Sequence, residues 1–187
     1  MTPDNARQLM HEWTASPNLR VHMECVAACM GAYADVRAAS ERDRWIVAGL
    51  LHDMDYEKHP TQQEHPFVGI AHLRQHTDVD EEIINAILGH AEYSGTPRDT
   101  NMARCLFAVD ELAGFIVACA KVRPNGISDL EPKSVIKKLK DKAFAAAVSR
   151  DDIARGIEEL NIDRAEHIQR CIHAIRDSAF IVSSGGL

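Results

Sequence analysis

The sequence contains few aromatic residues and no long apolar run. Phe, Trp and Tyr make up 5% of its 187 residues, so a hydrophobic core must consist mainly of Ala, Leu, Ile, Val and Met. No apolar segment reaches the ~18 residues that a membrane span requires, and the opening Met1-Thr2-Pro3-Asp4 does not start a signal peptide. These absences predict a cytoplasmic protein that has no membrane partner.

Paired cysteines and a positive net charge are also absent. The formal charge is −7, which argues against a nucleic acid polymer as partner, because such binding needs many phosphate contacts from Lys and Arg. A small nucleotide stays compatible with this charge, since a metal ion supplies positive charge locally. The cysteines are odd in number, form no CxxC pair and are predicted to be buried thiols in a reducing compartment: Cys25, Cys29, Cys105, Cys119 and Cys171.

No strand-like alternation, internal repeat or linker interrupts the chain, which predicts one all-α domain over residues 1–187. Within it we expect a metal-site core at 19–120, C-terminal helices at 121–182 and a disordered tail at 183–187. Apolar residues at three- and four-residue spacing predict the helices. They span about 4–14, 19–36, 40–53, 65 onward, 80–90, 101–121, 151–160 and 164–180.

Short polar residues mark the expected helix starts. Asp80 and Ser149 are predicted to cap the helices that follow them, and Asp4 or Asn5 the first helix. We expect Glu64 to cap a helix that begins at His65-Pro66, because Pro suits a first helical turn. The segment 16–18, Ser-Pro-Asn, is predicted to break the chain between two helices.

An adjacent His52 and Asp53 end the apolar helix pattern that runs from Trp45 to Leu51. Burying either polar side chain without a partner costs about 1–3 kcal/mol. A pair of this kind can be a helix end that hydrogen-bonds to backbone, and it can also bind a divalent metal.

Four further residues favour the metal. His22, His65, His90 and Asp110 each lie in or at the end of a different apolar helix pattern, and helical folds build metal sites from side chains on facing helices. We expect Asp53 to bridge two ions. His22, His52 and Asp110 would complete the shell of one ion, and His65 and His90 that of the other. Imidazole and carboxylate ligands fit one or two ions of Mn, Fe, Co, Ni or Zn.

The remaining histidines lie on mixed or polar helix faces. We interpret them as surface or packed residues that take no part in the site: His11, His59, His72, His76, His167 and His173.

The order His22, His52-Asp53, Asp110 resembles the signature of the HD-domain superfamily of metal-dependent phosphohydrolases. The segment His65-Pro66-Phe67-Val68-Gly69 is similar to the His-Pro-x-x-Gly segment of its dinuclear members, and His90 stands where their following histidine falls. The resemblance covers about residues 19–115. The segment 93–97, Tyr-Ser-Gly-Thr-Pro, only echoes the Gly-Tyr-Pro segment of the cyclic-di-GMP phosphodiesterases, which argues against that activity.

The resemblance implies hydrolysis of a phosphate ester or anhydride in a small phosphorylated or nucleotide substrate by metal-activated water. Asp53, Asp55 and Lys58 are the candidate catalytic residues. Asp55 and Glu24 would carry protons or hydrogen-bond to the histidines. The candidates for holding substrate phosphate, each of which also fits a solvated surface charge, are Arg123, Lys138 and Lys142.

Two other functions stay open. The same ligand order resembles that of the mixed-valence di-iron oxygenases of the superfamily, and residue types alone do not distinguish the two reactions. The third alternative is a non-catalytic, metal-stabilised domain that binds a nucleotide or a partner. The sequence leaves a homodimer open.

Overall fold

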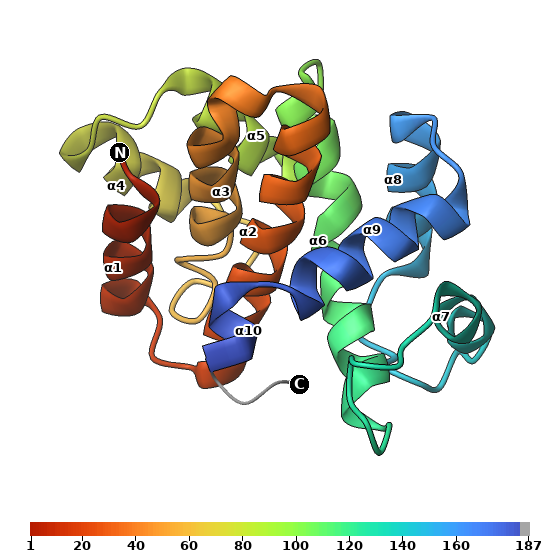
Figure 1. The fold of residues 1–187 in the computed structure, drawn as a ribbon. Helices are drawn as coiled ribbons and strands as arrows, with labels where there is room; N and C mark the ends of the chain where they lie inside the picture. Colours follow the sequence, from red (N-terminus) through yellow and green to blue (C-terminus); the bar gives the residue numbers. More distant parts are fainter. Residues whose placement is uncertain (184–187) are drawn as a thin grey trace.

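The computed structural model describes residues 1–183, and this part of the chain is helical without a strand, which confirms the all-α prediction (Figure 1). No helix in this part is long and apolar enough to cross a membrane. The α-helices and 3₁₀ turns follow in the order α1 (Pro3–Trp13), α2 (Pro17–Arg37), η1 (Ala39–Glu41), α3 (Arg42–Leu51), α4 (Phe67–His76), α5 (Glu81–His90), η2 (Glu92–Ser94), α6 (Asn101–Lys121), α7 (Pro132–Leu139), α8 (Arg150–Leu160), α9 (Arg164–Arg176) and α10 (Ala179–Ser183).

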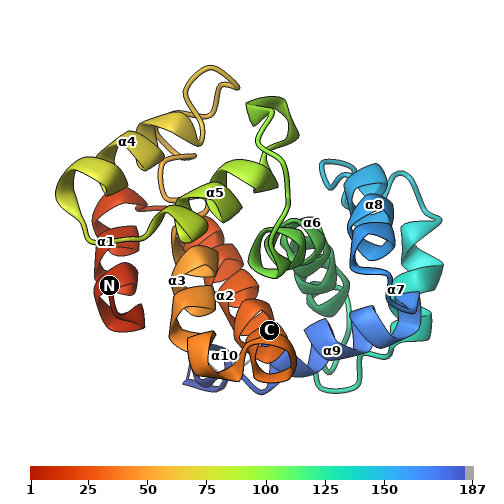
Figure 2. The same ribbon diagram turned by 90° about the horizontal axis from the view of Figure 1, so that it is seen from above.

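Helices α2, α3 and α6 form the centre of the molecule (Figure 2). On one side α1 and α5 pack against α3, with α4 against α5, and on the other α8 and α9 pack against α6. Two glycines allow close helix contacts. A Cβ atom at Gly49 would lie 2.6 Å from the Ala27 backbone, and one at Gly156 would lie 2.5 Å from that of Ala108. A larger residue would therefore push α3 from α2, or α8 from α6.

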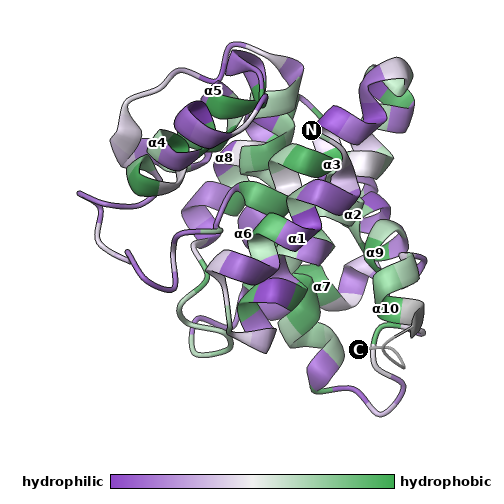
Figure 3. Ribbon diagram, turned by 90° about the vertical axis from the view of Figure 1, so that its left-hand side faces the viewer, coloured by the Kyte–Doolittle hydropathy of each residue, from purple (hydrophilic) through white to green (hydrophobic). Residues whose placement is uncertain are grey.

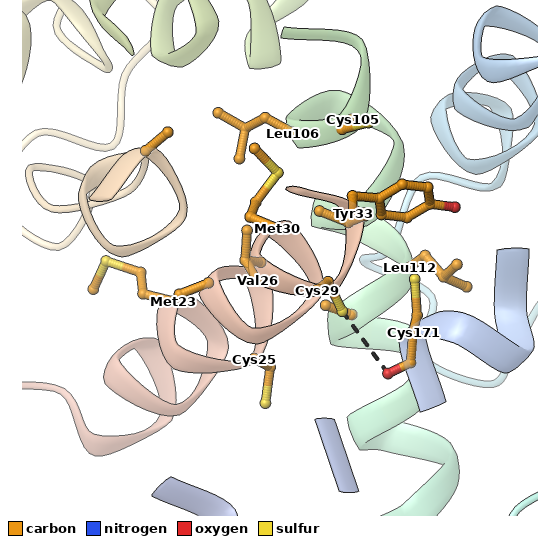
Figure 4. Packing of buried hydrophobic residues seen from close by; sticks show 14 of the residues in the cluster. Met23, Cys25, Val26, Cys29, Met30, Tyr33, Cys105, Leu106, Leu112 and Cys171 are labelled. Carbon is orange, nitrogen blue, oxygen red and sulfur yellow. Dashed lines mark hydrogen bonds between the residues drawn. The ribbon is translucent and has the colours of Figure 1, made fainter. Parts of the chain in front are cut away.

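The core consists mainly of aliphatic residues, methionines and cysteines (Figure 4). The cysteines are buried and free, as predicted from their odd number and spacing. Met23, Met30 and Leu106 are fully buried, and each such side chain contributes about 1.5–3 kcal/mol of hydrophobic stabilisation. Hydrophobic residues continue along the central helices, whereas the connecting loops are largely hydrophilic (Figure 3).

Several helix starts differ from the sequence prediction. Thr2, rather than Asp4 or Asn5, caps α1, and its hydroxyl accepts the Asn5 N–H. The Ser-Pro segment expected to separate two helices begins the second one, because Ser16 caps α2 and Pro17 is its first residue. The predicted caps Asp80 and Ser149 are confirmed for α5 and α8.

The predicted cap at Glu64 is wrong. Its carboxylate instead accepts a hydrogen bond from Thr61 Oγ1 at 2.8 Å and contacts His59 at 3.3 Å. Helix α4 begins at Phe67 without a side-chain cap, so His65 and Pro66 precede it.

The last predicted helix, 164–180, is interrupted at residues 177–178. The Ser178 hydroxyl donates to the Ile175 carbonyl at 3.0 Å and accepts the Ile181 N–H at 3.3 Å. One side chain thus closes α9 and opens α10. Ser183, which the sequence assigned to a disordered tail, is the last residue of α10. The rest of that predicted tail, 184–187, lies outside the described residues.

Candidate metal centre

His52 and Asp53 lie at the point where α3 ends against the core. His52 keeps helical backbone angles directly after Leu51, and its side chain is buried. Its Nδ1 atom lies 2.8 Å from the Gly49 carbonyl oxygen. This contact makes Nδ1 a hydrogen-bond donor, so Nε2 is the nitrogen that faces Asp53 and Asp110.

The first ligand group joins α2, the end of α3 and α6. His22 Nε2 lies 3.2 Å from His52 Nε2 and 2.9 Å from Asp110 Oδ1. Asp53 Oδ2 lies 3.7 Å from the His22 nitrogen and 3.6 Å from the His52 nitrogen. Four side chains that are far apart in the sequence thus present their ligating atoms to one point.

The second ligand group uses the other oxygen of Asp53. His65, just before α4, and His90, the last residue of α5, bring their Nε2 atoms to 3.2 Å from each other. These atoms lie 3.3 Å and 3.5 Å from Asp53 Oδ1. The carboxylate of Asp53 therefore lies between the two groups, with one oxygen toward each.

The donor atoms of both groups fit divalent metal ions. Within each set of three, His22/His52/Asp53 and Asp53/His65/His90, the ligating atoms lie within 4.8 Å of one another. Nitrogen ligands about 2.0–2.1 Å from a shared ion are themselves roughly 3.0–3.4 Å apart, in agreement with the two 3.2 Å nitrogen pairs. The structure thus brings together the six predicted ligands and is compatible with one ion or two.

Hydrogen bonds to the Nδ1 atoms hold the imidazole rings of the second group in position. His65 Nδ1 lies 2.7 Å from Asp55 Oδ1, and the other oxygen of Asp55 accepts the Gly69 N–H at 2.6 Å. A Cβ atom at Gly69 would lie 3.1 Å from the Asp55 carboxyl group, so a glycine at this position leaves room for the carboxylate. His90 Nδ1 contacts the Ile87 carbonyl oxygen. Partners of this kind fix the tautomer and orientation of metal-binding histidines.

Asp55, a candidate catalytic residue from the sequence, is therefore placed behind His65. It is buried, and both of its oxygens are engaged away from the ligand atoms. The geometry matches the alternative in which Asp55 hydrogen-bonds to a histidine, and makes it a positioning residue.

Burial and opposite charges act against each other in the first group. Burial disfavours a charged imidazole, but the carboxylates of Asp53 and Asp110 outweigh it and raise the pKa of His52 to about 9. Burial likewise disfavours the two carboxylates, yet His52 and its neighbouring histidines hold the pKa of each well below its usual range. Without a bound ion, the group thus favours a positive imidazole between negative carboxylates.

Glu111 continues the cluster toward α8. Burial, together with the charge of Asp110, raises the pKa of its carboxyl group to about 7. The carboxylate accepts the backbone N–H of Ser149, the cap of α8, at 3.0 Å. This hydrogen bond links the metal-centre helix to the C-terminal helices.

The first group is the more open of the two. The side chains of His22, Asp53 and Asp110 are 21%, 15% and 17% exposed, whereas those of His65 and His90 are 4% and 5% exposed. The exposed edge of the centre is therefore formed by His22, Asp53 and Asp110, whereas His52 is 0% exposed.

Two exposed tyrosines that the sequence analysis did not single out lie beside the centre. The Tyr56 ring lies 5.1 Å from the His65 ring. Burial and the charges of Asp53 and Asp55 raise the pKa of Tyr93 to about 12, which places its hydroxyl within their field. Their loops follow α3 and α5 and lie at one edge of the molecule in Figure 2. The sequence signal for them is their spacing, because Tyr56 follows Asp53 by three residues and Tyr93 follows His90 by three.

Lys58 and Glu24 have partners elsewhere. Lys58 Nζ lies 5.6 Å from the centre of the Trp13 ring, and the buried Glu24 pairs with Arg7 at 2.5 Å. The structure does not bring either side chain to the histidines.

The three candidate phosphate-binding residues also lie away from the centre. Arg123 follows the end of α6, and the 11 helical steps from Asp110 to Lys121 span about 16 Å. Arg123 pairs with Asp129 at 2.9 Å, Lys138 pairs with Asp141 at 3.6 Å, and Lys142 is exposed.

The family model of the HD domain matches residues 20–114, just over half of the chain. The chain belongs to the HD-domain family. This match includes all six candidate ligands and Asp55, while Arg123, Lys138 and Lys142 lie beyond it. The match confirms the predicted superfamily, which consists mostly of metal-dependent hydrolases. Both the match and the geometry of the ligands support metal binding. Neither a curated protein nor a solved structure matches the chain significantly.

Proposed function

We propose that this HD-domain protein is a metal-dependent phosphohydrolase that cleaves a phosphate ester or anhydride bond in a small phosphorylated or nucleotide substrate. The observation that carries this proposal is the pair of ligand groups that share the two oxygens of Asp53. Two-ion sites of this type favour in-line displacement at phosphorus, because both the attacking and the leaving oxygen are stabilised.

In this proposal His22, His52, Asp53 and Asp110 hold one ion, and Asp53, His65 and His90 hold the other. Bound divalent ions supply activated water near neutral pH and neutralise charge on the phosphoryl oxygens. The chain keeps the buried rings in position through the Gly49 and Ile87 carbonyls and Asp55. The substrate enters over the exposed edges of His22 and Asp110, and Tyr56 and Tyr93 lie on the side of His65 and Asp53.

Elemental analysis and hydrolysis assays test this proposal. Protein purified without added metal or chelator is expected to contain a transition metal and to hydrolyse members of a panel of phosphomonoesters, phosphodiesters and nucleotides. The His52→Ala/Asp53→Ala variant should lose both properties. Asp43→Asn, an exposed change on the same helix α3, should keep both. Absence of metal after purification and after titration with Mn, Fe, Co, Ni and Zn would contradict the proposal.

The second candidate is a mixed-valence di-iron oxygenase, because the six ligands that the structure brings together also follow the ligand order of those enzymes, and imidazole and carboxylate donors do not distinguish the two reactions. Iron content with substrate-dependent oxygen uptake would identify this activity. Turnover of a phosphate compound without oxygen would identify the hydrolase.

The third candidate is a non-catalytic, metal-stabilised binding domain, and the Asp53 variants distinguish it. Loss of turnover with an intact fold indicates a catalytic centre. Loss of the fold together with the metal, in a protein that turns over none of the compounds, indicates a structural ion.

A further inference from the structure

A separate pocket lies where the end of α6 meets α7. It has a volume of about 360 Å³, within the range of small-molecule sites. The part of the chain that forms it follows residues 20–114, so it is outside the HD-domain match. It is lined by Cys119, Val122, Arg123, Leu130, Ser134, Lys137, Lys138 and Asp141. We call this hollow the cationic pocket.

Positive side chains dominate its polar wall. Arg123, Lys137 and Lys138 contribute three cations to the lining, in which Asp141 is the one carboxylate. Lys138 pairs with Asp141 at 3.6 Å, and Arg123 pairs with Asp129 outside the lining at 2.9 Å. Lys137 is exposed and forms no ion pair among residues 1–183. A lysine that has no ion-pair partner and lies beside a pocket is able to bind an anion there.

The rest of the lining is mainly apolar. Leu130 and Cys119 are buried, whereas Val122 is 62% exposed at the end of α6. Burial raises the pKa of the Cys119 thiol to about 11, while Lys138 and Arg123 act to lower it, so the field of these cations reaches the apolar wall. The only neutral polar side chain in the lining is Ser134, which gives a neutral polyol few hydrogen-bond partners.

From these observations we propose that the cationic pocket binds a small amphiphilic anion, a carboxylate or phosphate with an apolar body. The anionic group contacts Lys137 and Lys138, and the apolar part covers Leu130 and Val122. This site is independent of the metal centre and of the reaction there, because the 16 Å of α6 estimated above separates them.

Binding to the whole protein can be measured by titration calorimetry with four probes. Octanoate and octylphosphonate carry the apolar chain with each head group, octanol carries the chain alone, and inorganic phosphate carries the charge alone. We expect saturable binding of octanoate, octylphosphonate or both, with affinity about tenfold or more above that of octanol and of phosphate. The tighter of the two identifies the head group. Equal affinity for octanol, or no saturable binding of either anion at millimolar concentration, would overturn the proposal.

Matched variants locate the binding. Lys137→Met/Lys138→Met should weaken binding of the preferred anion about tenfold or more. The control Lys133→Met/Lys140→Met makes the same charge change at exposed positions of the same segment outside the lining, and should bind as the unaltered protein does. Equal weakening of anion binding in both double variants would show a general charge effect and contradict binding in the cationic pocket. Metal content measured on the same samples keeps this result separate from the proposed hydrolase.

Discussion

Two fully buried histidines, one in the metal centre and one between α6 and α9, have opposite electrostatic properties. His52 faces the carboxylates of Asp53 and Asp110, which raise its pKa to about 9. His167 contacts the Tyr33 hydroxyl at 2.5 Å and the Ala108 carbonyl oxygen at 3.1 Å. Burial lowers its pKa to about 4, and the Ala108 carbonyl only partly opposes this.

The difference shows that burial alone does not make a histidine functional. His167 stays neutral, donates a hydrogen bond from Nε2 to the Ala108 carbonyl and accepts one at Nδ1 from the Tyr33 hydroxyl. Both of its ring nitrogens are therefore satisfied within the core. Figure 4 shows Tyr33 among the buried residues. The Nε2 atom of His52 has no such neutral partner and faces the carboxylates of Asp53 and Asp110. A metal ion satisfies that arrangement, and four separate predictions test the contrast.

The largest effect is expected from Asp53→Asn, which removes the charge shared by the two ligand groups. Metal content should fall to one ion or fewer. Hydrolysis should fall on the order of a thousandfold, because metal ions supply several kcal/mol of transition-state stabilisation. In metal-free protein the pKa of His52 should fall below 9, toward the behaviour of His167, as measured by NMR titration of the ring. Asp43→Asn serves as the control. Unchanged metal content in Asp53→Asn would refute the bridging role.

His167→Gln should reduce the acid sensitivity of the fold. The pKa of His167 is about 4 in the folded protein and about 6.5 in an unfolded chain, so the unfolded state binds the proton first. Its contribution to stability is therefore complete above pH 6.5 and is lost as pH falls toward 4. Between pH 7.5 and 4.5 this amounts to about 2–3 kcal/mol.

Urea unfolding at these two pH values measures it. The stability difference between them should be smaller in His167→Gln, whereas His173→Gln, an exposed change on the same helix, should leave it unaltered. An equal difference in both variants would mean that His167 is not the group responsible.

Asp55→Asn should lower the metal affinity of one ligand group and leave that of the other unchanged. Loss of the carboxylate behind His65 is expected to weaken metal binding there about 10- to 100-fold. The group of His22, His52 and Asp110 should keep its affinity, since Asp55 contacts none of them in the structure. Competition with a chelator, followed by elemental analysis, resolves the two affinities. A similar loss from both groups would show that Asp55 supports the fold of the whole centre.

The metal ligands could be predicted because polar residues within apolar helices or at their ends need partners inside the core. Cationic side chains could not be placed in this way. Lys58 and Arg123 are long and lie in loops, so their partners, Trp13 and Asp129, depend on tertiary contacts. The same holds for Ser16, because a Ser-Pro pair can both separate helices and cap one. The sequence placed His167 on a mixed or polar face, yet it is fully buried, because the Tyr33 hydroxyl and the Ala108 carbonyl, which the sequence could not bring to it, satisfy its ring.

The smallest effect is expected from Tyr33→Phe, which removes the hydroxyl that donates to His167 Nδ1. One buried acceptor then loses its partner while the aromatic ring keeps its packing, so the free energy of unfolding should fall by about 1–2 kcal/mol. Metal content and hydrolysis should stay unchanged, because no carboxylate or ligand is involved. Loss of metal from Tyr33→Phe would mean that the two buried histidines depend on each other, and that the contrast between them is not local.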